Sequence, residues 1–514
     1  MRKITFLLIF VCHFAYTQDF QWVQRPAIDF SSNGDLIGYN TACDVSGNVY
    51  FAGFKDDAFH YNETMGNSFF NKYSADGILL FEKTFTGHVA VNEMVCDAQS
   101  NVVVALSFVA SVAIDGTELS TSAQGVHNAL FKFDANGQLI WHKQFALNQW
   151  SEPEILALAT DATGNLYAAY HDFLDSKIEK ISVDGTTLMT ISQPHVRMVS
   201  SLSVDNQGNI YAAGSCAEWG SDFNGLQIES PFDYNTFLVK YSPEGSPQWV
   251  RFIEDITCTK PEVVAVTPDE VYFSSYLFGT PALDDLSTEG PVSMFADFFL
   301  AQLNSDGAFQ WVREVPGNGT AQPGNRRFLW PGVNGEIVFA GSTRGAINWS
   351  DSWNTTSQGT IEDALLLKYD KQGNLLMAQT AGGAANDRID AICVGPTGAV
   401  YTGGLARGTA TFGALVFAAQ PDQYWPFLAR LDHGLLATNV PALKTFGWHP
   451  NPATHSLFIS GTDNVVSGAV LNALGQKLFE FTADRYNPID VSALSSGSYL
   501  VKSQDGSAFK LIKN

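Results

Sequence analysis

The sequence predicts an all-β protein, a seven-bladed β-propeller followed by a small antiparallel β-sandwich. Apolar and polar residues alternate over short runs broken by Gly, Asp and Asn, which is the period-two pattern of strands, and no long stretch has helical spacing. One unit recurs along most of the chain, and the N-terminal strand supplies a piece that the last unit lacks. With 45% hydrophobic and 13% aromatic residues, the chain has enough apolar material for a large core.

Residues 1–17 are predicted to be a signal peptide. Arg2 and Lys3 precede an apolar run over residues 4–14, and small side chains before Gln18 offer a cleavage site. The run is too short to span a bilayer as a helix. Since no other stretch reaches eighteen apolar residues, the sequence predicts no transmembrane segment.

The repeated unit has two pieces, each built on a glycine turn. The first is an Asp-x-x-Gly-Asn turn that leads into an apolar strand, as in residues 44–50, 161–167 and 205–211. The second is a strand that ends in an Asp-Gly or Asn-Gly turn, whose residues reach positive φ at little cost. Seven glycines of this second kind, separated by 48 to 66 residues, indicate seven units: Gly77, Gly137, Gly185, Gly245, Gly307, Gly373 and Gly434.

A large apolar residue follows four positions after most of these glycines and indicates one structural socket per unit. The seventh unit lacks this strand, but residues 20–23 (Phe-Gln-Trp-Val) repeat residues 309–312 of the fifth unit. The N-terminal strand therefore completes the last unit, as expected for a closed ring whose blades bury their faces only against one another. The socket residues are Phe81, Trp141, Met189, Trp249, Trp311 and Met377.

The seventh copy of the unit is similar to the SBBP family of bacterial propeller repeats. Its residues 381–387 (Ala-Gly-Gly-Ala-Ala-Asn-Asp), 395–404 and 427–432 carry the likeness, which extends over residues 20–434. This resemblance implies the propeller fold and no particular function, because propellers host many unrelated activities.

The last seventy residues resemble the type A C-terminal sorting domain of the type IX secretion system of Bacteroidetes. Motifs at residues 450–452, 471–476, 489–494, 497–501 and 510–514 fall in the family's order. The resemblance implies export by the type IX machinery, processing by its surface peptidase, and a secreted or outer-membrane surface location. The predicted sorting-signal residues are Pro450, Asn451, Pro452, Gly475, Gly497, Tyr499 and Lys513.

These observations predict the domain organisation. A signal peptide at 1–17 precedes a propeller at 18–434 that the N-terminal strand closes, and a linker at 435–446 leads to the sorting domain at 447–514.

The formal charge of -23 repels phosphate backbones and anionic lipid, so neither nucleic acid nor a membrane surface is expected as a partner.

Five cysteines follow the predicted signal peptide. Their odd number and wide separation are unlike a disulfide framework, so we expect buried thiols. The cysteines are Cys43, Cys96, Cys216, Cys258 and Cys393.

The histidines are scattered singly, and no spacing indicates a catalytic residue, a metal site or a cofactor.

A basic residue recurs at one position of the unit. Because it belongs to the repeat rather than to one blade, we expect a structural role, with the stem on apolar surface and the charged head in solvent. The residues are Lys72, Lys132, Lys180, Lys240, Lys368 and Arg430, with Gln302 at the remaining position.

The best candidates for ligand binding are loop tryptophans outside the repeated socket, Trp219, Trp349, Trp353 and Trp425. The long connections between second and third strands emerge on one face of the predicted ring, where loops on a rigid scaffold recognise partners. The other interpretation is that these rings cap blade ends.

Two functions stay open at this point. The first is a surface or secreted propeller that binds a glycan or protein. The second is a polysaccharide-active hydrolase or lyase with acid and base residues on propeller loops. An enzyme would need convergent carboxylates of perturbed pKa in a central pocket.

Overall fold

A computed structural model describes most of the chain. Within the described residues every regular element is a strand, and none is a helix. The predicted signal peptide and linker lie outside these residues. The described ranges are 19–26, 36–55, 58–60, 63–121, 125–145, 155–171, 174–217, 220–255, 259–291, 297–317, 319–358, 361–418, 424–432, 447–460, 465–472, 476–484, 487–503 and 508–514.

The chain divides into two compact units, and the larger covers residues 18–433. Its first sheet has nine strands in the order β10-β9-β7-β6-β5-β3-β2, with β4 and β8 paired beside it. The bounds are β2 Leu36–Cys43, β3 Val49–Lys55, β4 Ala58–His60, β5 Glu63–Tyr73, β6 Leu79–Cys96, β7 Val102–Ile114, β8 Thr117–Ser120, β9 Val126–Phe133 and β10 Leu139–Phe145.

Three four-stranded sheets follow, and in each the strands lie in chain order apart from a small inserted hairpin in the second. The first is β11 Ile155–Thr160, β12 Leu166–His171, β13 Ser176–Ile181 and β14 Thr187–Gln193. The second is β15 Met198–Val204, β16 Ile210–Ala217, β19 Tyr234–Tyr241 and β20 Pro247–Glu254, with the hairpin β17 Ser221–Phe223 and β18 Leu226–Ile228. The third is β21 Glu262–Thr267, β22 Glu270–Leu277, β23 Asp297–Leu303 and β24 Phe309–Glu314.

Two further sheets complete this unit. One contains β25 Thr320–Pro323, β26 Leu329–Pro331, β27 Ile337–Arg344, β30 Asp363–Tyr369, β31 Leu375–Gly383, β34 Thr409–Phe412 and β35 Leu415–Ala418, with the separate hairpin β28 Ala346–Ser350 and β29 Trp353–Thr356. The other has the order β1-β36-β33-β32, formed by β1 Phe20–Gln24, β36 Tyr424–Leu431, β33 Val400–Arg407 and β32 Arg388–Val394.

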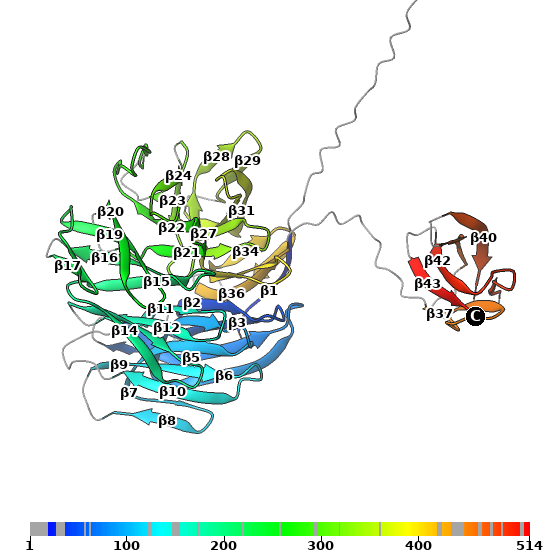
Figure 1. Ribbon diagram of the computed structural model, residues 1–514, viewed down its shortest axis with the longest axis horizontal. Helices are drawn as coiled ribbons and strands as arrows, with labels where there is room; N and C mark the ends of the chain where they lie inside the picture. Colours follow the sequence, from blue (N-terminus) through cyan, green and yellow to red (C-terminus); the bar gives the residue numbers. More distant parts are fainter. Residues whose placement is uncertain are drawn as a thin grey trace, which may run out of the picture. The chain divides into compact units, whose positions relative to one another are not determined.

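The innermost strands of successive sheets contact one another in chain order, from β2 through β6, β11, β15, β21 and β26 to β32, and β32 contacts β2 again. Apolar clusters fill the spaces between neighbouring sheets. In Figure 1 the inner strands β2, β11, β15 and β21 lie near the middle of the larger unit, with strands such as β10 and β20 further out. Antiparallel sheets packed face to face around a closed ring are the arrangement of a β-propeller.

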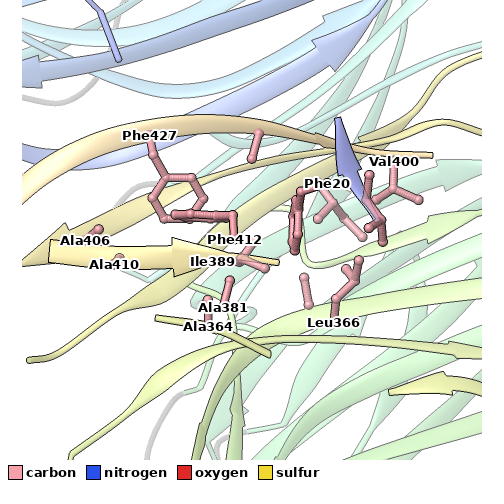
Figure 2. Packing of buried hydrophobic residues seen from close by; sticks show 14 of the residues in the cluster. Phe20, Ala364, Leu366, Ala381, Ile389, Val400, Ala406, Ala410, Phe412 and Phe427 are labelled. Carbon is pink, nitrogen blue, oxygen red and sulfur yellow. The ribbon is translucent and has the colours of Figure 1, made fainter. Parts of the chain in front are cut away.

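The two ends of the ring meet in one sheet. β1 pairs antiparallel with β36, with Phe20 opposite Leu431. Phe20 packs edge-on against Phe412, and Figure 2 shows both rings in the buried cluster of this region. The N-terminal strand thus lies beside the last long strand of the ring.

A disulfide crosses the same seam. Cys43 at the end of β2 is bonded to Cys393 in β32, with the Cα atoms 5.9 Å apart. The expectation that all the cysteines are buried thiols was therefore wrong for this pair, because ring closure brings together positions 350 residues apart in sequence. Cys96 is a free thiol, the sulfur of the buried Cys216 lies 3.6 Å from Ser230 Oγ, and Cys258 lies outside the described residues.

The repeated aromatic socket joins each sheet to the next. The Nε1 of Trp22 donates to the carbonyl of Ala75 at 2.9 Å, and its ring lies where a Cβ on Gly77 would approach to 2.9 Å. Gly77 has a φ of 78°, which a side chain would strain, so glycine is required here on both counts. Trp141, Trp249 and Trp311 make the same bond, to Val183, Ser305 and Lys371.

Four of the repeated basic residues, Lys72, Lys132, Lys240 and Lys368, are buried, and Lys180 and Arg430 are partly buried, which corrects the expectation of solvated heads. Lys72 is 3% exposed, and its Nζ lies 2.9 Å from Asp44 Oδ2 and 2.8 Å from the carbonyl of Ala135, in the turn between β9 and β10. The head is buried because the turn aspartate lies on the adjacent strand and supplies its counter-charge. Lys132 and Lys180 pair with Asp97 and Asp161 in the same way. The exception, Gln302, donates to the carbonyl of Asp269.

The C-terminal unit has two sheets around one apolar cluster that includes Leu457, Val470, Val501 and Leu511. The three-stranded sheet has β37 Gly447–His449, β38 Ser456–Ser460 and β41 Ile489–Asp490. The four-stranded sheet has the order β40-β39-β42-β43, formed by β40 Lys477–Ala483, β39 Val466–Leu471, β42 Gly497–Ser503 and β43 Ala508–Lys513.

We predict that replacing both Cys43 and Cys393 by Ser lowers the free energy of unfolding by about 2–5 kcal/mol, because the crosslink no longer restricts the unfolded chain. Urea unfolding without reductant measures the effect. Cys216→Ser, at a buried thiol outside the seam, is the control and should lower stability less. An unchanged midpoint for the double variant would contradict this role.

Candidate functional site at the centre of the ring

Irregularities in the innermost strands shape the centre of the ring. The pairing register of β6, β11, β15 and β32 shifts at Asn92, Leu156, Ser200 and Asp390. An extra residue at such a bulge bends the strand and re-aims its side chains. Leu156 and Ser200 line a central cavity, which the same bulged stretches help to form.

The central cavity has a volume of about 20 Å³. Its charged lining comes from three places in the chain: Glu93, Lys260 with Glu262, and Arg326 with Arg327. A space of this size holds about one water molecule. It is therefore a small polar chamber rather than a substrate cleft.

Arg327 links sheets that are far apart in sequence. Its Nη2 donates to the carbonyl of Leu158 in β11 at 2.6 Å and lies 3.8 Å from Glu93 Oε1 in β6. The backbone carbonyl of Arg327 accepts from the N–H of Ile392 in β32. The side chain of Arg327 thus contacts the sheets of β6 and β11, and its backbone contacts that of β32.

Two buried carboxyls face this arginine. Burial raises the pKa of Glu262 to about 8, and the nearby carboxyl of Glu93 also acts to raise it. The charge of Arg327 and the N–H groups of Leu329 and Phe328 act in the opposite direction and lower this pKa. Burial also raises the pKa of Glu93, although Arg327 and the N–H of Met94 oppose this. At neutral pH Glu262 is therefore mainly protonated, and the carboxyl oxygen of Glu93 lies 3.8 Å from Arg327 Nη2.

The sequence interpretation did not identify this cluster. A signal was present, because Glu262 opens an otherwise apolar strand and Arg326-Arg327 precede Phe328-Leu329, another apolar segment. A charge in an apolar inner strand of a ring must point to the centre or be paired.

Two more carboxyls are buried near the ends of β30 and β31. Burial raises the pKa of Asp363 to about 6 and that of Asp387 to about 7. Asp387 accepts from the N–H groups of Gly383 at 2.7 Å and Arg407 at 3.0 Å, which indicates that it holds loop backbone in place. Across the described ranges, no three His, Cys, Asp or Glu side chains are grouped to bind a metal ion.

The predicted ligand-binding tryptophans fall in different environments. Trp349 and Trp353 lie on the hairpin β28–β29 and are half-buried, and Trp349 Nε1 donates to Thr355 Oγ1 at 2.8 Å. Trp425 is 8% exposed, with the Arg25 guanidinium 4.8 Å from its ring centroid. Trp219 lies outside the described residues. The structure brings Trp349 and Trp353 together, and a binding role for the four stays a prediction.

The predicted sorting-signal residues are mostly on the surface of the C-terminal unit. Pro450, Asn451 and Pro452 are exposed, and the Asn451 side chain bonds the backbone of Lys510 at 2.9 Å and of Ile512 at 2.8 Å. This side chain therefore ties the Pro-Asn-Pro segment to the last strand, β43.

The remaining sorting-signal residues lie in the four-stranded sheet or beyond the described part. Tyr499 donates its hydroxyl to the carbonyl of Ser495 at 2.8 Å. Gly497 begins β42, Lys513 ends β43, and Gly475 lies outside the described residues.

Residues 448–514 match the family described as secretion system C-terminal sorting domain. The chain thus carries a type IX sorting domain, which indicates handling by that system and export to the cell surface or secretion. No helix among the described residues is long and apolar enough to cross a membrane. None of the curated proteins compared matches the chain.

Several solved structures are distantly similar. A protein of unknown function from Bacteroides caccae is 11% identical, with 61% of this chain and 89% of that one covered and a TM-score of 0.34. An inactive virginiamycin B lyase from Staphylococcus aureus with quinupristin is 10% identical, with 79% and 98% covered and a TM-score of 0.39. The Dos1 propeller is 9% identical, with 81% and 96% covered and a TM-score of 0.37. Similarity at this level says nothing about what this chain binds.

Glu262 predicts a pH dependence of stability. Below pH 4.5 its carboxyl is protonated whether the chain is folded or not, and between 4.5 and about 8 only the folded protein keeps the proton. The free energy of unfolding should therefore fall over this range, by about 3–5 kcal/mol from this group alone. Glu262→Gln, which stays neutral, should match the parent near pH 4.5 and exceed its stability at pH 8.

Urea unfolding of the parent and Glu262→Gln at both pH values measures this difference. Glu244→Gln, at an exposed turn, is the control and should follow the parent. Parallel pH profiles for parent and Glu262→Gln would show that burial does not perturb this carboxyl.

Proposed function

We propose that this chain is a seven-bladed β-propeller, followed by a sorting-domain sandwich, that is exported in a member of the Bacteroidetes and binds a glycan or protein outside the cell. A signal peptide at 1–17, a propeller at 18–434, a linker at 435–446 and a sorting domain at 447–514 belong to this proposal. So does the SBBP-type repeat.

The strand pairing supports seven blades. β6 has 18 residues, and its first part pairs with β5 while its second part pairs with β7. The nine-stranded sheet can therefore be divided into two blades at the middle of β6. Similarly, β34 and β35 add to the edge of β31 and lie outside the four-strand pattern of that blade.

Export has two independent supports. The sorting domain provides the signal, and the Cys43–Cys393 disulfide fits an oxidising compartment, where such bonds persist. We propose that the surface peptidase of the type IX system removes the C-terminal unit, with Pro450, Asn451, Pro452, Gly475, Gly497, Tyr499 and Lys513 in the recognised signal.

The observation that carries the binding function is the hairpin β28–β29, which holds Trp349 and Trp353. The pairing of Ser350 with Trp353 places the second ring beside the hairpin turn. Half-buried aromatic rings at such a site offer a rigid face that stacks on sugars or fills a partner's pocket. Trp219 and Trp425 belong to the same proposal, although Trp425 contributes less exposed surface.

The alternative is a polysaccharide hydrolase or lyase. The pair Glu93 and Glu262 favours it, because these are converging carboxyls of raised pKa. Their cavity of about 20 Å³ opposes it, since a glycosidase needs a sugar ring between its two carboxyls. The geometry therefore supports binding better than hydrolysis.

We predict that a glycan and protein array probed with the mature protein detects retention without cleavage. Trp349→Ala and Trp353→Ala should weaken the retained ligand by about 1–4 kcal/mol if the rings are hot spots. Trp249→Ala, in the repeated socket, is the control and should reduce stability while folded protein still binds. Cleavage of an arrayed polysaccharide that Glu262→Gln abolishes would favour the enzyme instead.

We also predict that deletion of residues 447–514 leaves a folded ring that is no longer exported. Cell fractionation of a host with the type IX system measures its location, and proteolytic resistance measures its folding. Fusion of these residues to a foreign periplasmic protein should send that protein out. Normal surface delivery of the truncated chain would refute the role of the sorting domain.

A further inference from the structure

A second and larger cavity lies at the other end of the innermost strands. Its volume is about 250 Å³, many times the ~10–15 Å³ that one water needs. Cys96, Thr160 and Val204 line it. Thr160 and Val204 directly precede the aspartate of an Asp-x-x-Gly turn, and Cys96 precedes the equivalent turn, in which Ser100 stands in the place of the glycine. The cavity therefore lies on the side of the tight turns, opposite the long connections that the sequence interpretation favoured for recognition.

The walls of this cavity, which we call the turn-side cavity, combine apolar and polar surface in about equal amounts. Val95, Ala159, Leu202, Val264 and Leu329 contribute aliphatic surface from five sheets, and the ring of Trp330 adds an aromatic wall. Trp330 is half-buried, and the guanidinium of Arg327 lies 5.2 Å from its ring centroid. The apolar part of these walls favours a ligand with an apolar body.

The polar side chains of the turn-side cavity include the strong hydrogen-bond donor Arg327. Arg327 and Glu262 line both this cavity and the small central one, so they lie between the two. A guanidinium has five N–H donors, of which Leu158 and Glu93 engage only part. Because burial raises the pKa of Glu262 to about 8, its carboxyl also carries a proton at neutral pH.

We propose that the turn-side cavity binds a small carboxylate with an apolar body, of the size of an aromatic acid, with its head on Arg327. Charge complementarity selects the head group, since a carboxylate accepts both guanidinium and hydroxyl protons. The apolar walls and Trp330 select the body. This site is separate from the hairpin β28–β29 and does not depend on the function proposed for it.

Cys96 provides a reporter inside the cavity. Its thiol is half-buried and free, so a bound ligand should shield it from alkylation. We expect benzoate and indole-3-acetate to slow iodoacetamide modification of Cys96 in the full chain, measured by peptide mass spectrometry. The matched neutral amides, benzamide and indole-3-acetamide, should protect at least tenfold more weakly.

Two variants separate the head from the body of the site. Arg327→Met should remove the preference for the carboxylate over the amide. Thr160→Phe, which narrows the cavity, should abolish protection by every compound. Thr190→Phe, at an exposed position of β14, is the matched control and should behave as the parent. If Arg327→Met fails to fold, Thr160→Phe and the acid-to-amide comparison decide the question.

Three results would overturn the proposal. The first is that no carboxylate protects Cys96, the second is equal protection by acids and amides, and the third is unchanged protection in a folded Thr160→Phe variant. None of these results bears on the array experiment, because Trp349 and Trp353 do not line this cavity.

Discussion

The structure depends on the contact in which an aromatic side chain of one sheet covers the turn glycine of the next. Trp22, Trp141, Trp249 and Trp311 each place the indole N–H on a turn carbonyl and the ring against a glycine. Each contact fixes the distance and rotation between two neighbouring sheets. A ring closes only if this distance and this rotation are nearly the same at every junction between sheets. One repeated contact therefore sets the geometry of the whole unit.

The buried lysines reinforce the same junctions. Lys240 donates to the carbonyl of Ser305 in the following sheet, and Lys72 donates to that of Ala135, in the turn between β9 and β10. An ion pair also joins Lys72 to Asp44. A buried ion pair adds little net stability, but removal of one partner leaves an uncompensated charge. These lysine contacts therefore determine how neighbouring parts of the ring align more than they add to its stability.

Most of the fold was readable from the sequence because it repeats. The turn glycines predicted the strand ends, and the likeness between residues 20–23 and 309–312 predicted where the N-terminal strand lies. The disulfide and the buried lysine heads were not predicted, because each depends on contacts between distant positions that spacing does not show.

The centre of the ring was also missed, for a related physical reason. Glu93, Glu262 and Arg327 are neighbours only because strands from different sheets converge there, and none of them occupies a repeated position. A repeated sequence pattern indicates only the contacts that every sheet has in common. What distinguishes this ring from others, its central charges and its hairpin tryptophans, lies in residues that break the pattern.

Closure at the seam places a constraint on folding as well as on stability. β1 is at the start of the ring and its partner β36 at the end, so their pairing brings together residues about four hundred positions apart. Contacts of such separation form late, because the loop entropy must be overcome before they contribute. The sheets between them must therefore be in place before β1 can dock. The disulfide between β2 and β32 crosslinks the first sheet to the sheet that contains β1 and β36, so it reinforces the closure that the pairing of β1 makes.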